Sequence, residues 1–313
     1  MVAMPAMFAQ TKNVARECVL FELMTGVHCG NCPAADEAIE EMLADGLLIA
    51  PVCYQAPSYS VPELTCDEVA ARVAYYDAMG YPTLFMDGSI SLPGGSSGMN
   101  YMYYQPYYEQ EIAKTSPFTI AMDLESVGGN LYKANCHVEQ VGDCSGSDVR
   151  LFIVLTQSHI PFSWGGGDYV NWNVRDMIPT HLGTPFAGPA MDFSETFEIS
   201  YPLEDCQLVA WVQDYTGNKE VYQAVMMEAN TVSVADNPMV SEAVYPNPSN
   251  GQFNLNLGEG HWDVEVYDIT GRMVYENRQE GHSVIDLGQC PKGMYFLRAR
   301  NNNTEITNKM MLR

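Results

Sequence analysis

The sequence predicts a multidomain protein in which an α/β domain is followed by an antiparallel β-sandwich and then by a small all-β domain. Residues 17–115 alternate apolar runs of strand length with helical periodicities, whereas residues 117–229 alternate apolar and polar positions with a period of two. Residues 244–313 contain short strand-like runs separated by turn signals, and the polar residues 230–243 are predicted to be a linker. Because 47% of the 313 residues are hydrophobic, each part has enough apolar material for a core.

The α/β part is predicted to follow the order βαβαββα. Its first two helices end at Gly46 and Gly80, and Thr65 with Glu68 forms a capping-box pattern before the second helix. The last helix is a polar and aromatic segment. The expected strands are 19–23, 47–53, 83–86 and a short run at 90–92, and the expected helices are 34–45, 69–79 and 107–114.

Six strands are predicted in the sandwich, and a long insertion separates the third from the fourth. This insertion, residues 159–191, is rich in Gly, Trp and Pro and is too long to be a simple connection. Its aromatic residues Trp164, Tyr169 and Trp172 either form a contact surface or fold over the sandwich as a lid. The expected strands are 118–124, 130–138, 149–157, 192–200, 207–215 and 220–228.

The net charge argues against a nucleic acid partner, and the apolar pattern argues against a transmembrane helix. The 39 acidic and 15 basic residues give a formal net charge of −24, which repels phosphate backbones and anionic lipid headgroups, so no nucleic acid partner is expected. No apolar run approaches the ~20 residues of a membrane-spanning helix, so no transmembrane segment is expected. Residues 1–16 contain an apolar stretch with a small residue at Ala9 and are predicted to be the remnant of a signal peptide and leader.

Nine cysteines indicate an oxidising compartment, and six of them fall in closely spaced pairs. Cys53 with Cys66 is predicted to be a structural disulfide between the end of a strand and the start of a helix. Cys136 with Cys144 is predicted to be a second structural disulfide that clamps a hairpin. Three cysteines in separate segments are not paired by the sequence, namely Cys18, Cys206 and Cys290.

The third pair, Cys29 and Cys32, has the CxxC spacing and lies between an apolar strand and a helix that begins at the second cysteine. A helix N-terminus carries partial positive charge and free N–H groups, so it favours the thiolate of the first cysteine. Further along, Tyr81-Pro82-Thr83 precedes a strand, at a turn where a proline can be cis. These two motifs in the βαβαββ order resemble the thioredoxin superfamily over about a hundred residues.

That resemblance implies the roles of the sulfur atoms and of the turn. Cys29 would be the attacking thiolate and Cys32 the resolving thiol. Pro82 would be the cis-proline beside which a substrate backbone binds, between Tyr81 and Thr83.

The resemblance also implies two helpers of the dithiol. Glu22, seven residues before Cys29, would be the buried carboxylate that relays a proton to the resolving thiol. His28 stands where the family has a tryptophan, and an imidazolium there would stabilise the thiolate, whereas Asp36 and Glu37 oppose it. Cys29, Cys32 and His28 could also ligate a metal, but the other histidines are scattered singly, so no metal and no cofactor are expected.

The remaining parts of the chain carry two further resemblances. In the sandwich, Asn173-Val-Arg-Asp-Met177 and Leu208-Val-Ala-Trp-Val-Gln213 resemble the domain that follows a thioredoxin-like domain in a family of Bacteroidota outer-membrane proteins. In the last domain, Tyr245-Pro-Asn-Pro248, Val266-Tyr-Asp-Ile-Thr-Gly-Arg272 and Gly293-Met-Tyr-Phe-Leu297 resemble the Ig-like sorting domain of type IX secretion. This second resemblance implies recognition of residues 244–313 by the type IX secretion machinery, passage through the periplasm and delivery to the cell surface or outside.

Two functions follow from these patterns. In the first, the chain is a secreted or cell-surface thiol–disulfide oxidoreductase that acts on protein disulfides through Cys29 and Cys32. In the second, the chain is a non-catalytic surface adhesin or binding protein on a thioredoxin-like scaffold. There, Cys29–Cys32 is a structural disulfide and residues 159–191 contact a surface ligand.

Overall fold

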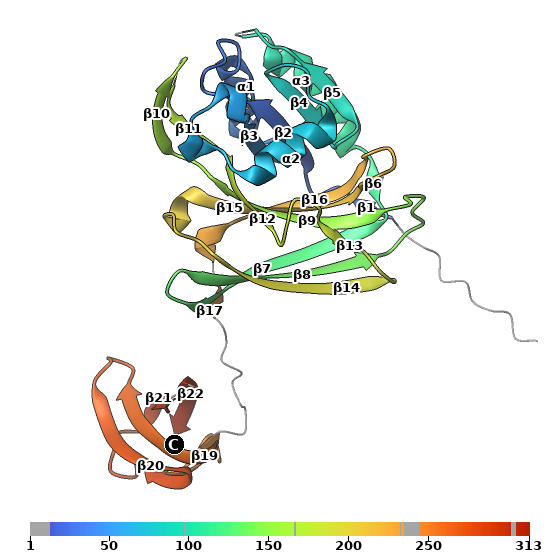
Figure 1. The fold of residues 1–313 in the computed structure, drawn as a ribbon. Helices are drawn as coiled ribbons and strands as arrows, with labels where there is room; N and C mark the ends of the chain where they lie inside the picture. The colour runs from blue at the N-terminus through green and yellow to red at the C-terminus, as the bar shows by residue number, and fades with distance from the viewer. Residues whose placement is uncertain (1–12, 97, 166, 232, 235–243, 302–304) are drawn as a thin grey trace, which may run out of the picture. The chain divides into compact units, whose positions relative to one another are not determined.

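The computed structural model describes residues 13–313 except 97, 166, 232, 235–243 and 302–304 (Figure 1). The chain divides into two compact units between Ser233 and Val234. Most of the predicted leader and most of the predicted linker lie outside the described residues.

A nine-stranded sheet runs through the first unit. Its strands are β2 (Val19–Thr25), β3 (Ile49–Gln55), β4 (Thr83–Met86), β5 (Ile90–Pro93), β9 (Val149–Gln157), β12 (Asn173–Ile178), β13 (Thr184–Pro185), β15 (Cys206–Asp214) and β16 (Val221–Glu228). The order is β16-β15-β9-β12-β3-β2-β4-β5, and β13 pairs with β9. β3 pairs in parallel with both β2 and β12, and the other pairs are antiparallel.

The pairing of β3 with β12 joins the two parts that the sequence predicts as separate domains. Asn173 lies opposite Cys53, and the Cys53 N–H donates to the carbonyl of Trp172 at 2.8 Å. Residues 17–115 and 117–229 therefore share one sheet and belong to one compact unit.

Helices cover both faces of the α/β part of this sheet. α1 (Pro33–Ala44) and α3 (Asn100–Ile112) pack with Phe21 and Leu23 of β2 on one face. α2 (Asp67–Tyr76) packs with Leu20 and Met24 on the other, because side chains alternate along a strand. α3 begins seven residues before the predicted start and continues through Pro106.

The start of α2 differs from the predicted capping box. Cys66 is the residue that caps the helix, and the Thr65 hydroxyl is buried with no hydrogen-bond partner among the described residues. The helix ends at Asp77, which has a left-handed backbone with φ of 52°. Because Asp77 takes the terminating conformation, α2 ends before the predicted stop at Gly80.

All six strands predicted for the sandwich are present, but its two sheets are unequal. A four-stranded sheet, ordered β14-β8-β7-β17, packs over β9, β15 and β16 (Figure 1). Ile153 and Ala210 face that sheet, whereas Val154 and Trp211 on the same strands face the α2 side. β9 and β15 are thus buried on both faces. The four strands are β7 (Phe118–Gly128), β8 (Leu131–Gln140), β14 (Ala190–Glu198) and β17 (Ser233–Val234), and a further short pair is β1 (Val14–Ala15) with β6 (Thr115–Ser116).

The long insertion forms a hairpin before it enters the main sheet. β10 (Ile160–Trp164) and β11 (Gly167–Val170) pair only with each other in the described part of the chain. His159 and Trp172, at the two feet of the hairpin, both have left-handed backbones, with φ of 53° and 51°.

The second unit is a five-stranded sheet with its own core, which includes Phe253, Val264, Leu297 and Met310. Its order is β18-β19-β21-β22, with β20 beside β19. The sequence pattern favours separate short strands at 252–257 and 263–267, and at 272–275 and 284–287. In the structure the first two form the single strand β19 and the second two form β20. The register of this pair shifts between Asn256 and His261. The strands are β18 (Val244–Tyr245), β19 (Gln252–Asp268), β20 (Met273–Asp286), β21 (Gly293–Arg300) and β22 (Glu305–Leu312).

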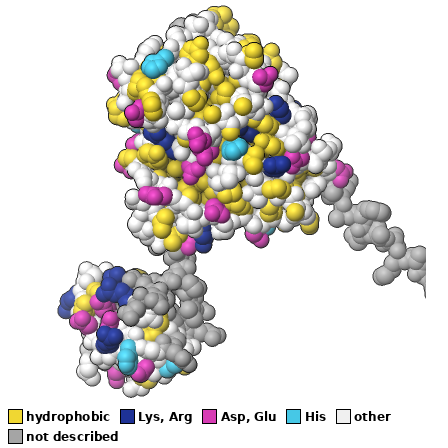
Figure 2. Space-filling view, viewed as in Figure 1, with side chains coloured by type: hydrophobic (Ala, Val, Ile, Leu, Met, Phe, Trp, Pro, Cys, Tyr) yellow, Lys and Arg dark blue, Asp and Glu magenta, His cyan; other side chains and the backbone are white. Residues whose placement is uncertain are grey.

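The surface agrees with the acidic composition. On the face drawn in Figure 2, Asp and Glu side chains of the first unit lie dispersed among apolar side chains. Within the described ranges, none of the helices combines the length and the apolar character that crossing a bilayer requires.

Candidate functional site

Cys29 and Cys32 form a disulfide at the start of α1, with their Cα atoms 5.4 Å apart. Cys32 occupies the cap position and Pro33 is the first helical residue, a position that suits proline because its nitrogen needs no hydrogen bond there. The preceding turn lies close to Tyr59: a Cβ on Gly26 would lie 2.5 Å from the Tyr59 carbonyl oxygen, so this position requires glycine.

The segment 81–83 lies beside this disulfide. The Tyr81 carbonyl oxygen is 3.4 Å from Cys29 Sγ, and the Tyr81–Pro82 peptide bond is cis. The Thr83 hydroxyl donates to the carbonyl of Gly80 at 2.8 Å, so this side chain supports the turn. The Tyr81 carbonyl thus contacts Cys29 Sγ, and Tyr81 also packs against the apolar cluster that contains both cysteines. His28 is exposed next to Cys29, and its backbone N–H donates to the Tyr59 carbonyl.

The hairpin of β10 and β11 covers the disulfide. Trp164 and Val170 belong to one apolar cluster with Cys29 and Cys32, and a Cβ on Gly165 would lie 2.2 Å from Pro33 Cγ. Cys29 is only 9% exposed and Cys32 is fully buried. A reactive cysteine is usually partly exposed to solvent, so the burial of Cys29 departs from the pattern of an open CxxC site. The hairpin of the insertion thus covers the dithiol, whereas Ile178 and Phe186, later in the insertion, pack in the sandwich core.

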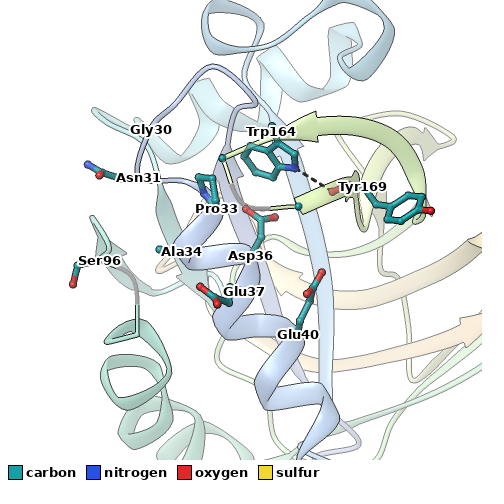
Figure 3. Close-up of a pocket in the computed structure, with 12 residues that line it drawn as sticks. Gly30, Asn31, Pro33, Ala34, Asp36, Glu37, Glu40, Ser96, Trp164 and Tyr169 are labelled. Atoms are coloured by element: carbon teal, nitrogen blue, oxygen red, sulfur yellow. Dashed lines mark hydrogen bonds between the residues drawn. The ribbon is translucent and has the colours of Figure 1, made fainter.

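A cavity of about 340 Å³ remains between α1 and the hairpin (Figure 3). Gly30 and Asn31, the two residues between the cysteines, line one end of it, and Trp164 and Tyr169 line the hairpin side. The Trp164 indole N–H donates to the Tyr169 carbonyl at 3.0 Å, which fixes the indole against this wall. Three carboxylates of α1, Asp36, Glu37 and Glu40, also line it, as does Ser96 of the segment before α3.

Glu22 does not reach the dithiol, and the role implied for it is corrected. It faces the α2 side of β2, where Arg72 donates to both carboxylate oxygens, at 2.7 and 2.9 Å. The hydroxyls of Tyr54 and Tyr76 donate to the same carboxylate. Because Arg72 also donates to Gln213 of β15 at 2.7 Å, this buried network connects the α/β part to the sandwich.

The predicted disulfide between Cys53 and Cys66 is absent, because both residues are free thiols on opposite sides of the sheet. Cys53 belongs to the core under α1, and its thiol donates to Asp36 Oδ1 at 3.9 Å. Cys66 packs on the α2 side, and burial raises the pKa of its thiol to about 11.

The predicted disulfide between Cys136 and Cys144 is also absent, since both are free. Cys136 is buried in the middle of β8, whereas Cys144 follows the end of that strand, in the segment leading to β9, and contacts the Tyr222 hydroxyl. Cys18, which the sequence leaves unassigned, is a buried free thiol that donates to the carbonyl of Ala224 at 3.0 Å. Burial raises the pKa of both Cys18 and Cys136 to about 12, so these thiols are unreactive.

Asp36 is a residue of the site that sequence reasoning treats only as a charge opposing the thiolate. Asp36 is 8% exposed, and the hydroxyl of Thr25 donates to its Oδ2 at 3.4 Å. Burial raises the pKa of Asp36 to about 8, helped by the charge of Glu40 and opposed by the hydrogen bonds from Thr25 and Cys53. An acidic residue four positions after Cys32, among inward-facing positions of α1, is the signal that could have identified it.

Comparison with known proteins defines the class of the second unit. Residues 243–313 match the family described as the Secretion system C-terminal sorting domain, which confirms the prediction for residues 244–313. The chain is therefore a protein exported by type IX secretion to the cell surface or the extracellular space.

One solved structure shares the fold of this chain over most of its length. HBP35 of Porphyromonas gingivalis is similar over 96% of this chain and 100% of that one, with a TM-score of 0.61 and 17% sequence identity. A domain of the outer membrane lipoprotein Omp28 from the same organism covers 36% of this chain and 88% of that chain at 16% identity, with a TM-score of only 0.29. The first similarity establishes a shared fold and the second carries no argument.

Two curated relatives match parts of the chain. An endo-acting ulvan lyase of Formosa agariphila is 24% identical over 102 residues, which is 31% of this chain and 19% of the relative. Ulvan lyase NLR42 of Nonlabens ulvanivorans is 24% identical over 188 residues, which is 52% of this chain and 34% of the relative. The matches thus span about a fifth and a third of these relatives.

Proposed function

We propose that the chain is an exported thiol–disulfide oxidoreductase whose first unit contains a thioredoxin-like part, residues 17–115. The observation that carries this proposal is the Cys29–Cys32 pair at the start of α1, with the Tyr81 carbonyl 3.4 Å from Cys29 Sγ. A backbone carbonyl beside the first sulfur is a hydrogen-bond acceptor for an extended substrate chain. The arrangement of β2, α1, β3, α2, β4 and β5 supports the thioredoxin-like assignment.

The reaction would begin from the reduced pair. The Cys29 thiolate, stabilised by the N-terminus of α1, attacks one sulfur of a protein disulfide and displaces the other as a thiolate. Cys32 then attacks Cys29 Sγ, which re-forms the Cys29–Cys32 disulfide and releases the second substrate thiol. His28 is exposed beside Cys29 and adds positive charge to the first step when protonated.

A second candidate function is supported by the low exposure of the pair. Cys29 is 9% exposed under the hairpin, as expected for a structural disulfide. On that hairpin Tyr169 is 52% exposed and could contact a surface ligand, with the disulfide bracing the scaffold below. The chain would then be a non-catalytic surface adhesin or binding protein.

The reduction potential of the pair separates the two functions. An oxidoreductase pair is expected between roughly −120 and −270 mV, whereas a structural disulfide lies below about −300 mV. The measurement is a redox titration of the full chain with thiol labelling and mass detection. The seven buried or half-buried free cysteines provide an internal reference, because their labelling should not change with potential.

Trapping of the covalent intermediate tests the roles of the two sulfurs. With oxidised glutathione as the probe, reduced Cys32→Ser should accumulate a glutathione adduct on Cys29, since the resolving thiol is missing. The matched control Cys29→Ser should accumulate little, because Cys32 is fully buried. If the two variants trap equally little and the wild-type pair stays oxidised in mild reductant, the binding function replaces the catalytic one.

A further inference from the structure

A small polar cluster lies in the apolar core beneath the dithiol. The Asp36 carboxyl accepts hydrogen bonds from Thr25 of β2 and from the Cys53 thiol of β3. On the α3 side, Tyr104 has a fully buried hydroxyl with no partner among the described residues. Burial raises the pKa of this phenol, and the charge of Asp36 raises it further. The two hydrogen bonds from Thr25 and Cys53 fix the orientation of the Asp36 carboxyl in this core.

Asp36 lies next to Cys32 on α1. The Asp36 N–H is 3.3 Å from the Cys32 carbonyl oxygen, so the helical repeat already holds between these two residues. Side chains four positions apart on a helix lie on one face, with Cβ atoms about 5–6 Å apart. Both side chains are inward-facing, since Cys32 is fully buried and Asp36 is 8% exposed.

The resolving step needs a base at this place. A thiol attacks a disulfide only as a thiolate, and the buried Cys32 cannot pass its proton directly to bulk water. Glu22 is on the opposite face and bound to Arg72, while Glu37 and Glu40 are exposed. Asp36 is the buried carboxyl on the same helix face, and it also lines the cavity beside Gly30 and Asn31, which offers the proton a path to solvent.

The ionisation of Asp36 suits this task. A carboxyl with a pKa of about 8 is a stronger base than an ordinary aspartate and exchanges protons with a thiol near neutral pH. The groups that face it are Glu40, whose charge raises its pKa, Tyr104, and the donors Thr25 and Cys53, which lower it.

We infer that Asp36, held by Thr25 and Cys53, accepts the proton of Cys32 during the resolving step. This inference rests on the proposed function. In the mixed disulfide, the Cys32 S–H proton passes to the Asp36 carboxylate as Cys32 Sγ bonds to Cys29 Sγ. The bond from Cys29 to the substrate sulfur breaks, and the substrate leaves as a thiolate that takes a proton from solvent. The proton on Asp36 then returns to water through the cavity.

The test measures how fast the mixed disulfide between Cys29 and glutathione decays as the pH changes. Reduced full-length protein is mixed with oxidised glutathione, quenched with acid and analysed by intact mass. The wild-type decay rate should rise with pH, and this rising limb of the rate–pH curve should have an apparent pKa of about 8. In Asp36→Asn the mixed disulfide should persist, with decay near neutral pH slower by roughly tenfold or more, and the limb should move to higher pH.

Two further variants separate proton transfer from a structural effect. Glu37→Gln removes the same charge from the adjacent exposed position and should leave the limb in place. Cys53→Ala removes one hydrogen bond to the carboxylate and should move the limb to higher pH by a smaller amount, which gives an independent readout if Asp36→Asn does not fold. Alkylation of Cys29 at the wild-type rate in Asp36→Asn shows that the site is intact.

The possible outcomes separate failure of the oxidoreductase function from failure of the role of Asp36. If the wild-type protein never forms the mixed disulfide, the proposed oxidoreductase function fails. If the mixed disulfide forms and decays with the same pH dependence in wild type and Asp36→Asn, the role of Asp36 is overturned while the oxidoreductase function stands. A uniform slowing at every pH, with the limb unmoved, also overturns the role, because it indicates a structural effect.

Discussion

The free energy of unfolding of Asp36→Asn, relative to that of wild type, should increase as the pH rises from acid to neutral. The ordinary pKa of an aspartate is 3.8, and burial raises that of Asp36 to about 8. Between these values the folded chain keeps a proton that the unfolded chain has lost, so wild-type stability falls as pH rises. The stability from this group is fully present below about pH 4 and is lost by about pH 8.

The magnitude follows from the linkage relation. Each pH unit in this window lowers the wild-type free energy of unfolding by about 1.4 kcal/mol, so about 4 kcal/mol is lost between pH 4 and pH 7. The amide that replaces the carboxyl in Asp36→Asn does not titrate, so the variant escapes this loss. The difference between Asp36→Asn and wild type should therefore grow by about 1.4 kcal/mol per pH unit, whatever its value at low pH.

Urea unfolding of both proteins at several pH values between about 4.5 and about 7.5 measures this difference. Other titrating groups contribute equally to both proteins and cancel in the comparison. Glu37→Gln, which removes an exposed carboxylate one residue away, should differ from wild type by a nearly constant amount. A constant difference for Asp36→Asn would mean that Asp36 has an ordinary pKa, and the argument for its role as proton acceptor would lose its chemical basis.

Two other perturbations test the framework around the site. Glu22→Gln should lower the free energy of unfolding by about 3–5 kcal/mol, because it leaves the buried Arg72 guanidinium without its counter-charge. It should not change how the rate of mixed-disulfide decay depends on pH. A shift of that pH dependence would restore Glu22 as the proton relay. Trp164→Ala should speed alkylation of reduced Cys29 several-fold by removing the indole that covers it, as followed by mass spectrometry, whereas an unchanged rate would show that the hairpin does not control access.

The parts of the site that the sequence predicts correctly are those with local causes. The start of α1 at Cys32 follows from the residues at its cap, and the turn at Tyr81-Pro82 is set by the proline and the strand after it. These features need only a few neighbouring residues. For the same reason, the six sandwich strands are predictable from their own alternation of apolar and polar positions.

The assembly of these elements depends on contacts that no local pattern contains. Only Asn173 and Cys53 are paired across β12 and β3. A contact this short produces no pattern in the sequence of either strand from which the continuous sheet could be predicted. The cysteine spacings are also misleading, because closeness along the chain says nothing about which face of a sheet a side chain occupies. Cys53 and Cys66 are 13 positions apart and are separated by the sheet itself.

The hairpin explains why the same disulfide supports two functions. An apolar cover such as Trp164 is compatible with a neutral disulfide, but it disfavours a thiolate at Cys29, because burial penalises the charged form. The covered arrangement therefore stabilises the oxidised pair relative to the reduced one. An oxidoreductase can use such a site only if the hairpin moves away from Cys29 when the pair is reduced, whereas a structural disulfide needs no such movement.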